Sequence, residues 1–334
     1  MKTPIAKKLA SGRWRVQVSV NKVRHSITRD TKKEAEKAAT LLKLSPAQRA
    51  KKITYREAID AYIDKYTTLN PSTSKHAKLS PSTVKGYRDI QRQRFQSIMD
   101  LPVSTPIDMQ AIINREDVSA KTIKNAYGLI STVLRDIGIE PPKVRYPTEA
   151  RKERPFLNSD QIKIFLKAIE GDRYELPYLL CLHSLRRSEM LALKKSQVRD
   201  GVIHVSGAVV LGEDGMVYKE TNKTKASVRD IPIFIERLSQ LVENAPDGVL
   251  CPYPVKGMEN HLRTILRKSD LPVSGFHMLR HSFASICYAS GVADLACMKW
   301  GGWSDYRTMR QIYTHLAEKQ EQADVEKLRN ALAE

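Results

Sequence analysis

The chain has little cysteine, few aromatic residues and no long apolar run, and each shortage excludes a class of protein. Its four cysteines show neither C-x-x-C spacing nor matched histidine pairs, so they indicate no zinc site and no disulfide framework. Aromatic residues make up 7% of the chain, which does not favour a stacking platform for single-stranded nucleic acid. Neither a membrane-spanning run nor a signal peptide is present in the sequence, so we expect a soluble, cytoplasmic protein.

Positive charge is in excess. The chain has 56 Lys and Arg against 37 Asp and Glu, and its net charge of +19 and isoelectric point near 9.7 predict a polyanionic partner. Residues 1–55 hold 15 basic and 3 acidic residues, so +12 of the +19 lies there. We interpret this density over a whole module as a phosphate-binding surface rather than a solvated lysine face.

Alternating residues predict two strands within residues 12–29. Apolar residues at 14, 16, 18 and 20 share one face, and Asn21-Lys22 offers a turn into a second strand from Val23. Thr31 and Glu34 form a capping-box pattern that opens a helix through about Leu44. Because sheet edges can enter the major groove of DNA, we name four candidate contacts there: Arg13, Arg15, Lys22 and Arg24.

Helical periodicity predicts an all-α module over residues 53–138. Apolar stripes indicate one helix around residues 58–63 and others from Ser82, Asp108 and Ala120, with a Pro/Ser/Thr/Lys-rich interruption over residues 70–81. These stripes are expected to form a core. Candidate DNA contacts on this module are Lys85, Arg88 and Arg92, with Arg94 beside them, although solvated surface explains any single one equally well.

Residues 139–156 combine prolines and mixed charge without periodicity, which predicts an extended linker. Asn158 and Gln161 then predict a capped helix, and the pattern to the end of the chain is mostly helical with one β interruption over residues 197–234. Within this interruption, strands are predicted over residues 201–205 and 227–233. The expected fold is therefore α+β, mainly α with small β elements. Its parts are residues 1–52, residues 53–138, the linker and residues 157–334.

Four separated motifs in the second half carry residue types suited to phosphodiester chemistry. They are LRRSE at 185–189, KTK at 223–225 followed by RDIP at 229–232, HMLRHSFA at 277–284, and GGWS at 301–304 followed by YTH at 313–315. A guanidinium fits two phosphate oxygens, a lysine or histidine can carry a proton, and a tyrosine can become a covalent nucleophile. Together these residues can break a phosphodiester without a metal ion.

The order Arg, Lys, His-x-x-Arg, Tyr resembles the tyrosine recombinases, most closely their lambda-integrase-like phage integrase branch. The resemblance covers about the last half of the chain, and four motifs agree in order and spacing. It implies a site-specific DNA recombinase that integrates or excises a mobile element. It also implies that residues 1–52 are an arm-type DNA-binding domain, residues 53–138 the core-binding domain and residues 157–334 the catalytic domain with its C-terminal tail.

The resemblance implies a role for each catalytic residue. Two arginines clamp the non-bridging phosphate oxygens, a tyrosine attacks phosphorus to give a 3′-phosphotyrosine, a lysine protonates the leaving 5′ oxygen, and a histidine assists proton transfer. A tryptophan, where most phage-type integrases have histidine, donates a hydrogen bond, with pure packing as the even alternative. In this sequence they are Arg186, Arg280, Tyr313, Lys223, His277 and Trp303.

Alternatives remain open at two of these positions. Lys219 and Lys225 are substitutes for the lysine. Tyr306 and Tyr288 are rival nucleophiles, but Tyr288 follows the histidine motif on a helix where an aromatic is more often core, and Tyr306 lies too close to Trp303 for the family spacing. Tyr313 fits the family order, although it lies one residue further from the tryptophan than in many family members.

The resemblance also implies the partners. They are double-stranded DNA at arm and core sites, a homotetramer on DNA joined by the tail Leu316 to Glu334, and DNA-bending and directionality factors, in a bacterial cytosol or a phage-infected host. No cofactor or metal is expected, because the phosphotyrosine stores the bond energy and no acidic pair suits a DDE-type transposase. The alternatives are a type IB-like topoisomerase, which would need neither basic arm nor tail, and an inactive architectural DNA-binding protein. An RNA-packaging role would leave the motifs unexplained.

Overall fold

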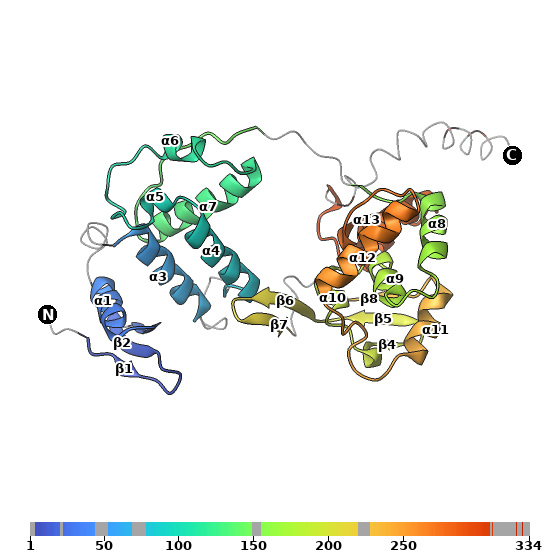
Figure 1. Cartoon of the computed structure of the whole chain (residues 1–334), viewed down its shortest axis with the longest axis horizontal. Helices are drawn as coiled ribbons and strands as arrows, with labels where there is room; N and C mark the ends of the chain where they lie inside the picture. Colours follow the sequence, from blue (N-terminus) through green and yellow to red (C-terminus); the bar gives the residue numbers. More distant parts are fainter. Residues whose placement is uncertain are drawn as a thin grey trace. The chain divides into compact units, whose positions relative to one another are not determined.

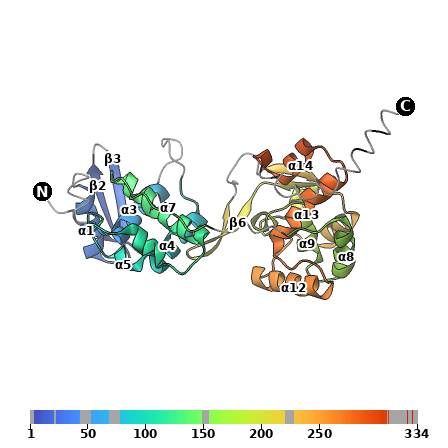
Figure 2. The same cartoon turned by 90° about the horizontal axis from the view of Figure 1, so that it is seen from above.

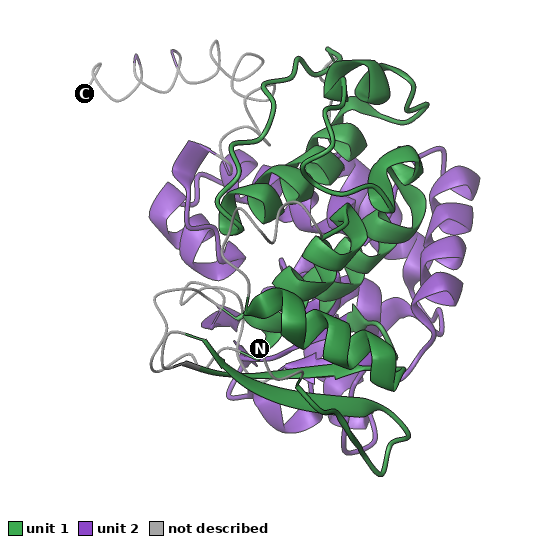
Figure 3. Cartoon of the chain, turned by 90° about the vertical axis from the view of Figure 1, so that its left-hand side faces the viewer, with its two compact units in different colours: residues 1–151, 211–215 green, residues 152–210, 216–334 purple. Residues whose placement is uncertain are grey.

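The structure is a computed structural model that describes residues 4–20, 23–43, 53–68, 78–148, 155–219 and 228–307, together with positions 309, 325 and 329. It contains two compact units, one of residues 1–151 with 211–215 and one of residues 152–210 with 216–334 (Figures 1 and 3). Helices predominate beside small antiparallel sheets, which confirms the predicted α+β class. Within the described ranges, no helix combines the length and apolarity needed to cross a bilayer.

The first unit opens with a three-stranded sheet in the order β1-β2-β3. β1 (Lys7–Lys8), β2 (Trp14–Val20) and β3 (Val23–Arg29) pair antiparallel. The helix α1 (Lys32–Leu42) packs on one face of this sheet (Figure 2). Alternation along β2 directs Val16 and Val18 to this face and polar residues to the other. The predicted capping box at Thr31 is present, and the helix ends two residues earlier than predicted.

The remainder of the first unit is helical. Its helices are α3 (Tyr55–Thr67), α4 (Pro81–Gln93), α5 (Gln96–Met99), α6 (Met109–Asn114) and α7 (Ala120–Asp136). Hydroxyl or carboxylate side chains at Thr54, Ser80, Asp108 and Ser119 accept from the first turns of the four longer helices. The helices predicted from Ser82, Asp108 and Ala120 begin within one residue of those positions, at Pro81, Met109 and Ala120. The short α5 was not predicted; it follows Phe95, whose backbone is left-handed with φ 50°.

The predicted boundary at residue 52 falls within residues 44–52, outside the described part of the chain. The sheet with most of α1 forms one apolar cluster and the helical module forms another, but Leu41 of α1 packs into the cluster of the helical module. The division into four parts stays a prediction.

In the chain from residue 155 onward, one group of helices is followed by a group of short strands and then by a second group of helices. The helices are α8 (Ser159–Ile169), α9 (Glu175–Leu182), α10 (Arg187–Met190), α11 (Glu236–Asn244), α12 (Val255–Lys268), α13 (Phe276–Ala289) and α14 (Asp294–Gly301). The strands are β4 (Val198–Arg199), β5 (Val202–Val205), β6 (Ala208–Gly212), β7 (Gly215–Lys219) and β8 (Arg229–Pro232), with a 3-10 turn at Lys195–Gln197.

The β interruption lies where the sequence predicted it. β4, β5 and β8 form one antiparallel sheet, and β6 with β7 forms a separate hairpin. Strands were predicted near β5 and β8, but this hairpin was not predicted, because the consecutive apolar residues 208–211 do not alternate with polar ones.

Two helices form the centre of the second unit. α9 and α13 pack against each other, and both are apolar around most of their circumference, which is typical of fully buried helices. His183, directly after α9, is buried and stacked on Phe234, and burial lowers its pKa to about 4. The neutral imidazole of His183 therefore lies at the C-terminal end of α9, where it bonds the Leu179 carbonyl, immediately before the first arginine motif.

Candidate active site

Arg186 is held at the turn between α9 and α10. Ser184, two residues earlier, has φ 72°, and the extended backbone of Arg186 (φ −70°, ψ 151°) starts α10. Its Nη1 donates to Glu189 Oε1 at 2.6 Å and its Nη2 to the Gly302 carbonyl at 2.8 Å. The side chain keeps 33% exposure, so its orientation is fixed while part of its donor edge stays accessible.

Arg280 reaches the same place from the buried face of α13. It is 2% exposed and donates to the carbonyls of Ser184 and Gly301. Because Gly301 and Gly302 are consecutive, the two arginines are held on adjacent carbonyls of one turn. Burial, and after it the charges of Arg186 and Arg229, lower the pKa of Arg280 to about 9. A nearby anion would relieve this repulsion.

Glu189 connects Arg186 to a third guanidinium. The carboxylate is 2% exposed and accepts two bonds from Arg229, at 3.1 and 2.9 Å, besides the bond from Arg186. Burial opposes its ionisation, yet the hydrogen bond and charge of Arg229 hold the pKa of Glu189 below its usual value. We call Arg186, Arg229, Arg280 and Glu189 the arginine cluster. With three guanidiniums to one carboxylate, it attracts anions.

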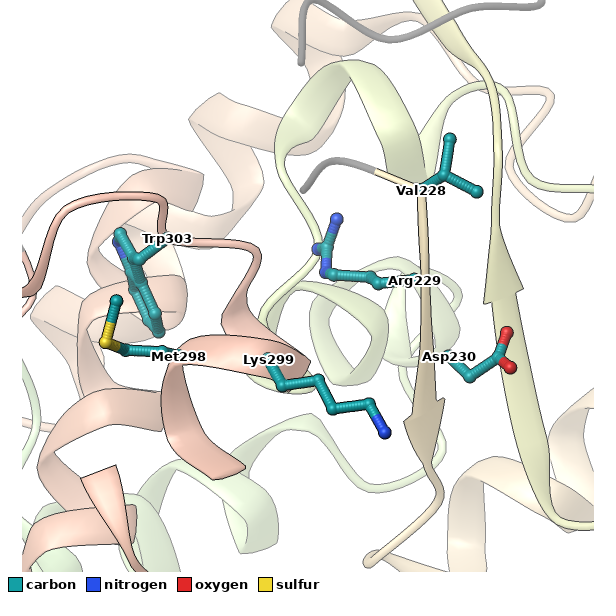
Figure 4. A pocket seen from close by; sticks show the side chains of 6 residues that line it. All are labelled: Val228, Arg229, Asp230, Met298, Lys299 and Trp303. Atoms are coloured by element: carbon teal, nitrogen blue, oxygen red, sulfur yellow. The ribbon is translucent and has the colours of Figure 1, made fainter. Parts of the chain in front are cut away.

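Trp303 lies beside this cluster. The centroid of its ring is 4.5 Å from the Arg280 guanidinium, and the ring stacks on Phe283 at 6.3 Å. These contacts agree with the packing role and leave the hydrogen-bonding role a prediction. Figure 4 shows Trp303 and Arg229 at one cavity of about 470 Å³, which is lined by Val228, Arg229, Asp230, Met298, Lys299 and Trp303.

His277 lies one helical turn before Arg280 and is exposed, whereas Arg280 is buried. Its ring meets that of the buried His281 edge-on at 4.8 Å. His281 is buried and belongs to the packed face of α13. An exposed imidazole beside a buried arginine suits proton transfer at a bound phosphate.

Three predicted residues, Lys22, Lys223 and Tyr313, and nearly all of the tail lie outside the described residues. The structure therefore brings together Arg186, Arg280 and Trp303, with His277 on the helix that carries Arg280. Of the rival nucleophiles, Tyr306 is 43% exposed and donates to Asp294 at 2.7 Å. Tyr288 is partly buried against the apolar cluster of α13 and α14.

The candidate DNA contacts of the sheet differ in how they are engaged. Arg15 and Arg24 are exposed and belong to the face opposite α1, where Arg24 donates to Gln17 at 2.6 Å. Arg13 pairs with Asp30 at 2.9 Å, and both side chains are more than half exposed. This face therefore offers guanidinium and amide groups of the kinds that bind phosphates and base edges.

The candidates on α4 are paired with acidic residues. Lys85 and Arg92 both bond Asp89, and Arg88 bonds Asp60 with 22% of its side chain exposed. A phosphate would have to displace these acidic partners, and the least exposed of the ion pairs is that of Arg88 with Asp60. All three stay predictions.

Arg229 is the residue of this site that the sequence analysis missed. It was noted only as the first residue of the RDIP strand motif. Alternation along β8 places Arg229 on the same face as the buried Ile231, and a charge on a buried face needs a partner. Its partner, Glu189, is 40 residues away in the sequence, so only the folded chain shows the pair. Among the described residues, no three His, Cys, Asp or Glu side chains group closely enough to hold a metal ion.

Comparison with known proteins agrees with this geometry. Residues 155–320 match the model of the phage integrase family. The chain is 27% identical over 292 residues to tyrosine recombinase XerA of Thermococcus onnurineus, covering 80% of this chain and 96% of that protein. It is 24% identical over 281 residues to the XerC-like tyrosine recombinase of Caldanaerobacter subterraneus subsp. tengcongensis, covering 69% and 72%.

Solved structures share the fold. The Tn1549 transposon integrase in complex with a circular intermediate DNA aligns with a TM-score of 0.59 at 18% identity, covering 83% of this chain and 99% of that one. A lambda integrase dimer bound to a COC′ core site aligns with a TM-score of 0.54 at 15% identity, covering 92% and 94%.

Proposed function

Since the chain belongs to the phage integrase family and is a tyrosine recombinase, we propose that it cuts and rejoins double-stranded DNA through a 3′-phosphotyrosine intermediate, without metal or ATP, to integrate or excise a mobile element. The observation that supports this most strongly is the pair Arg186 and Arg280 on the adjacent carbonyls of Gly302 and Gly301. Two guanidiniums fixed side by side match two non-bridging oxygens of one phosphate.

Arg186 and Arg280 would act on the transition state. In phosphoryl transfer, negative charge gathers on the non-bridging oxygens, and donors that are already oriented stabilise it without reorganisation. Glu189 and the two carbonyls orient the arginines before DNA binds. The lowered pKa of Arg280 means that the buried charge is held at a cost, which an oxyanion would offset.

The remaining residues would move protons and electron pairs. We assign Tyr313 as the nucleophile, so that its phenolic oxygen bonds to phosphorus as the 5′ oxygen leaves. Lys223 would protonate that oxygen, His277 would exchange a proton with the tyrosine or the leaving group, and Trp303 would donate a hydrogen bond. Because the phosphotyrosine conserves the energy of the broken bond, a returning 5′ hydroxyl can reseal the strand.

This proposal is tested by trapping the protein on nicked suicide duplexes tiled across the DNA that flanks its gene. We expect an adduct that survives denaturing electrophoresis and forms at the same rate in EDTA as in Mg²⁺. Loss of the adduct in EDTA, restored by adding Mg²⁺, would contradict a metal-free mechanism. Relaxation of supercoiled plasmid without any joining of two duplexes would favour the topoisomerase alternative.

We propose that residues 1–52 bind arm sites through the polar face of the sheet. The contacts would come from Arg13, Arg15, Lys22 and Arg24. The helical module would bind core sites through Lys85, Arg88 and Arg92. Residues 157–334 would carry the chemistry and a tail that joins four protomers on DNA, with DNA-bending and directionality factors assisting.

The sheet contacts predict a change in salt dependence. Replacing Arg15 and Arg24 together by glutamine should weaken binding to a short duplex of arbitrary sequence, and should lower the slope of log K against log salt by about 2, because each phosphate contact contributes about 0.9. The matched control is Lys33→Gln, which removes an exposed charge from α1 on the other side of the sheet. Equal slopes for the double variant and the native chain would place the DNA elsewhere. The measurement is a fluorescence anisotropy titration at several salt concentrations.

A further inference from the structure

Arg229 is a buried cation outside the set of residues assigned to the reaction. It starts β8, and its side chain is 3% exposed. Its Nε donates to the Trp300 carbonyl at 2.7 Å, and its Nη2 lies 3.3 Å from the Ser184 carbonyl. Its two terminal nitrogens also bind the two carboxylate oxygens of Glu189. A buried charge is tolerated when it is paired and hydrogen-bonded in this way.

The groups that Arg229 binds are also the groups that hold the two arginines proposed to clamp phosphate. The Glu189 carboxylate accepts hydrogen bonds from both the side chain and the backbone N–H of Arg186. The Ser184 carbonyl accepts a hydrogen bond from Arg280. Trp300 directly precedes Gly301 and Gly302, whose carbonyls accept hydrogen bonds from Arg280 and Arg186, respectively. Arg229 therefore contacts the supports of both arginines at once.

We propose that Arg229 is a positioning residue for the strand-transfer reaction, holding Glu189 and the turn at residues 300–302 so that Arg186 and Arg280 are aimed at the phosphate. This inference rests on the proposed function. Arg229 itself acts through its neighbours and bears no bond to DNA. The planar fork of a guanidinium is required, since a lysine would keep the charge but could bind one carboxylate oxygen and no second support in the same geometry.

The test compares Arg229→Lys with Arg187→Lys. Arg187 is the matched control because it is an exposed arginine next to Arg186. The readouts are melting temperature, DNA affinity and single-turnover cleavage of a suicide duplex. Cleavage is measured with an ordinary phosphate and with a neutral methylphosphonate at the scissile position. The duplex is one that the native chain has been shown to bind.

We expect Arg229→Lys to bind DNA within about twofold of the native chain and to cleave the ordinary phosphate about 10–100-fold more slowly, because misplacement of a catalytic group by about 1 Å has effects of this size. The defect should shrink on the methylphosphonate, which has one anionic oxygen fewer to hold. Arg187→Lys should match the native chain on both substrates. Equal cleavage by Arg229→Lys and the native chain would overturn the proposal, as would an equal defect on both substrates accompanied by a lower melting temperature.

A second readout keeps the proposal separate from the proposed function. In the DNA-free protein, the side-chain NMR signals of Arg186, assigned by their loss in Arg186→Lys, should change in Arg229→Lys and stay unchanged in Arg187→Lys. If the native chain never cleaves DNA, the proposed function fails, and this comparison alone decides whether Arg229 positions Arg186. Unchanged Arg186 signals in Arg229→Lys would overturn the positioning role.

Discussion

Replacing Tyr313 by phenylalanine is expected to abolish the covalent protein–DNA adduct and to leave DNA affinity unchanged. Phenylalanine keeps the ring and removes the only atom that would bond to phosphorus, so the loss should be about a thousandfold or more, down to the detection limit. The measurement is adduct formation on the suicide duplex in EDTA, with affinity measured in parallel. A phenol has an ordinary pKa near 10, so in the proposed mechanism a base would take its proton while Arg186 and Arg280 stabilise the charge on the non-bridging phosphate oxygens.

The controls for this experiment are the two rival tyrosines. Tyr306→Phe loses an exposed bond to Asp294, and Tyr288→Phe alters a partly buried ring, so both variants should still form the adduct. Persistence of the adduct in Tyr313→Phe, with loss in Tyr306→Phe, would transfer the nucleophile to Tyr306. Tight DNA binding with no adduct from any variant or from the native chain would favour the architectural alternative.

Replacing Arg280 by glutamine should slow cleavage by about 10²–10³-fold, the usual effect of removing one preorganised donor from a transition state. The folded protein should not lose stability in proportion. Burial and two neighbouring guanidiniums lower the pKa of Arg280, so folding at neutral pH includes an unfavourable charge that glutamine removes. Glutamine also keeps an N–H₂ group for the Ser184 or Gly301 carbonyl.

The expected combination is therefore a large loss of cleavage with a melting temperature equal to or above that of the native chain. Single-turnover cleavage and a thermal melt at pH 7 provide the comparison, with Arg187→Gln as the exposed control. A variant that cleaves normally would remove Arg280 from the catalytic set. A variant that unfolds well below the native melting temperature would instead indicate that the buried guanidinium is mainly structural.

Local patterns predicted the elements well because their causes are local. The capping boxes at Thr31 and Asn158 start helices where the sequence indicated, since a cap and its partner lie three residues apart. The alternation in β2 predicted which face is buried. The β6–β7 hairpin was missed, because its apolar residues are consecutive and show no alternation from which a strand could be recognised.

The sequence by itself determined the family and the residue types expected to carry its chemistry, because four motifs occur in the order that is typical of that family. Only the tertiary structure decided how the arginines are held. Glu189 accepts hydrogen bonds from Arg229, which is 40 residues away in the sequence. Arg280 donates to the Ser184 carbonyl, 96 residues away, and to the Gly301 carbonyl, 21 residues away. Arg186 donates to the Gly302 carbonyl, 116 residues away. Every residue has a backbone carbonyl, so the residue type does not show which carbonyl accepts a hydrogen bond from a side chain. A buried ion pair depends on which segments pack together. These contacts follow from the packing of α9, α13, α14 and β8, which no short stretch of sequence specifies.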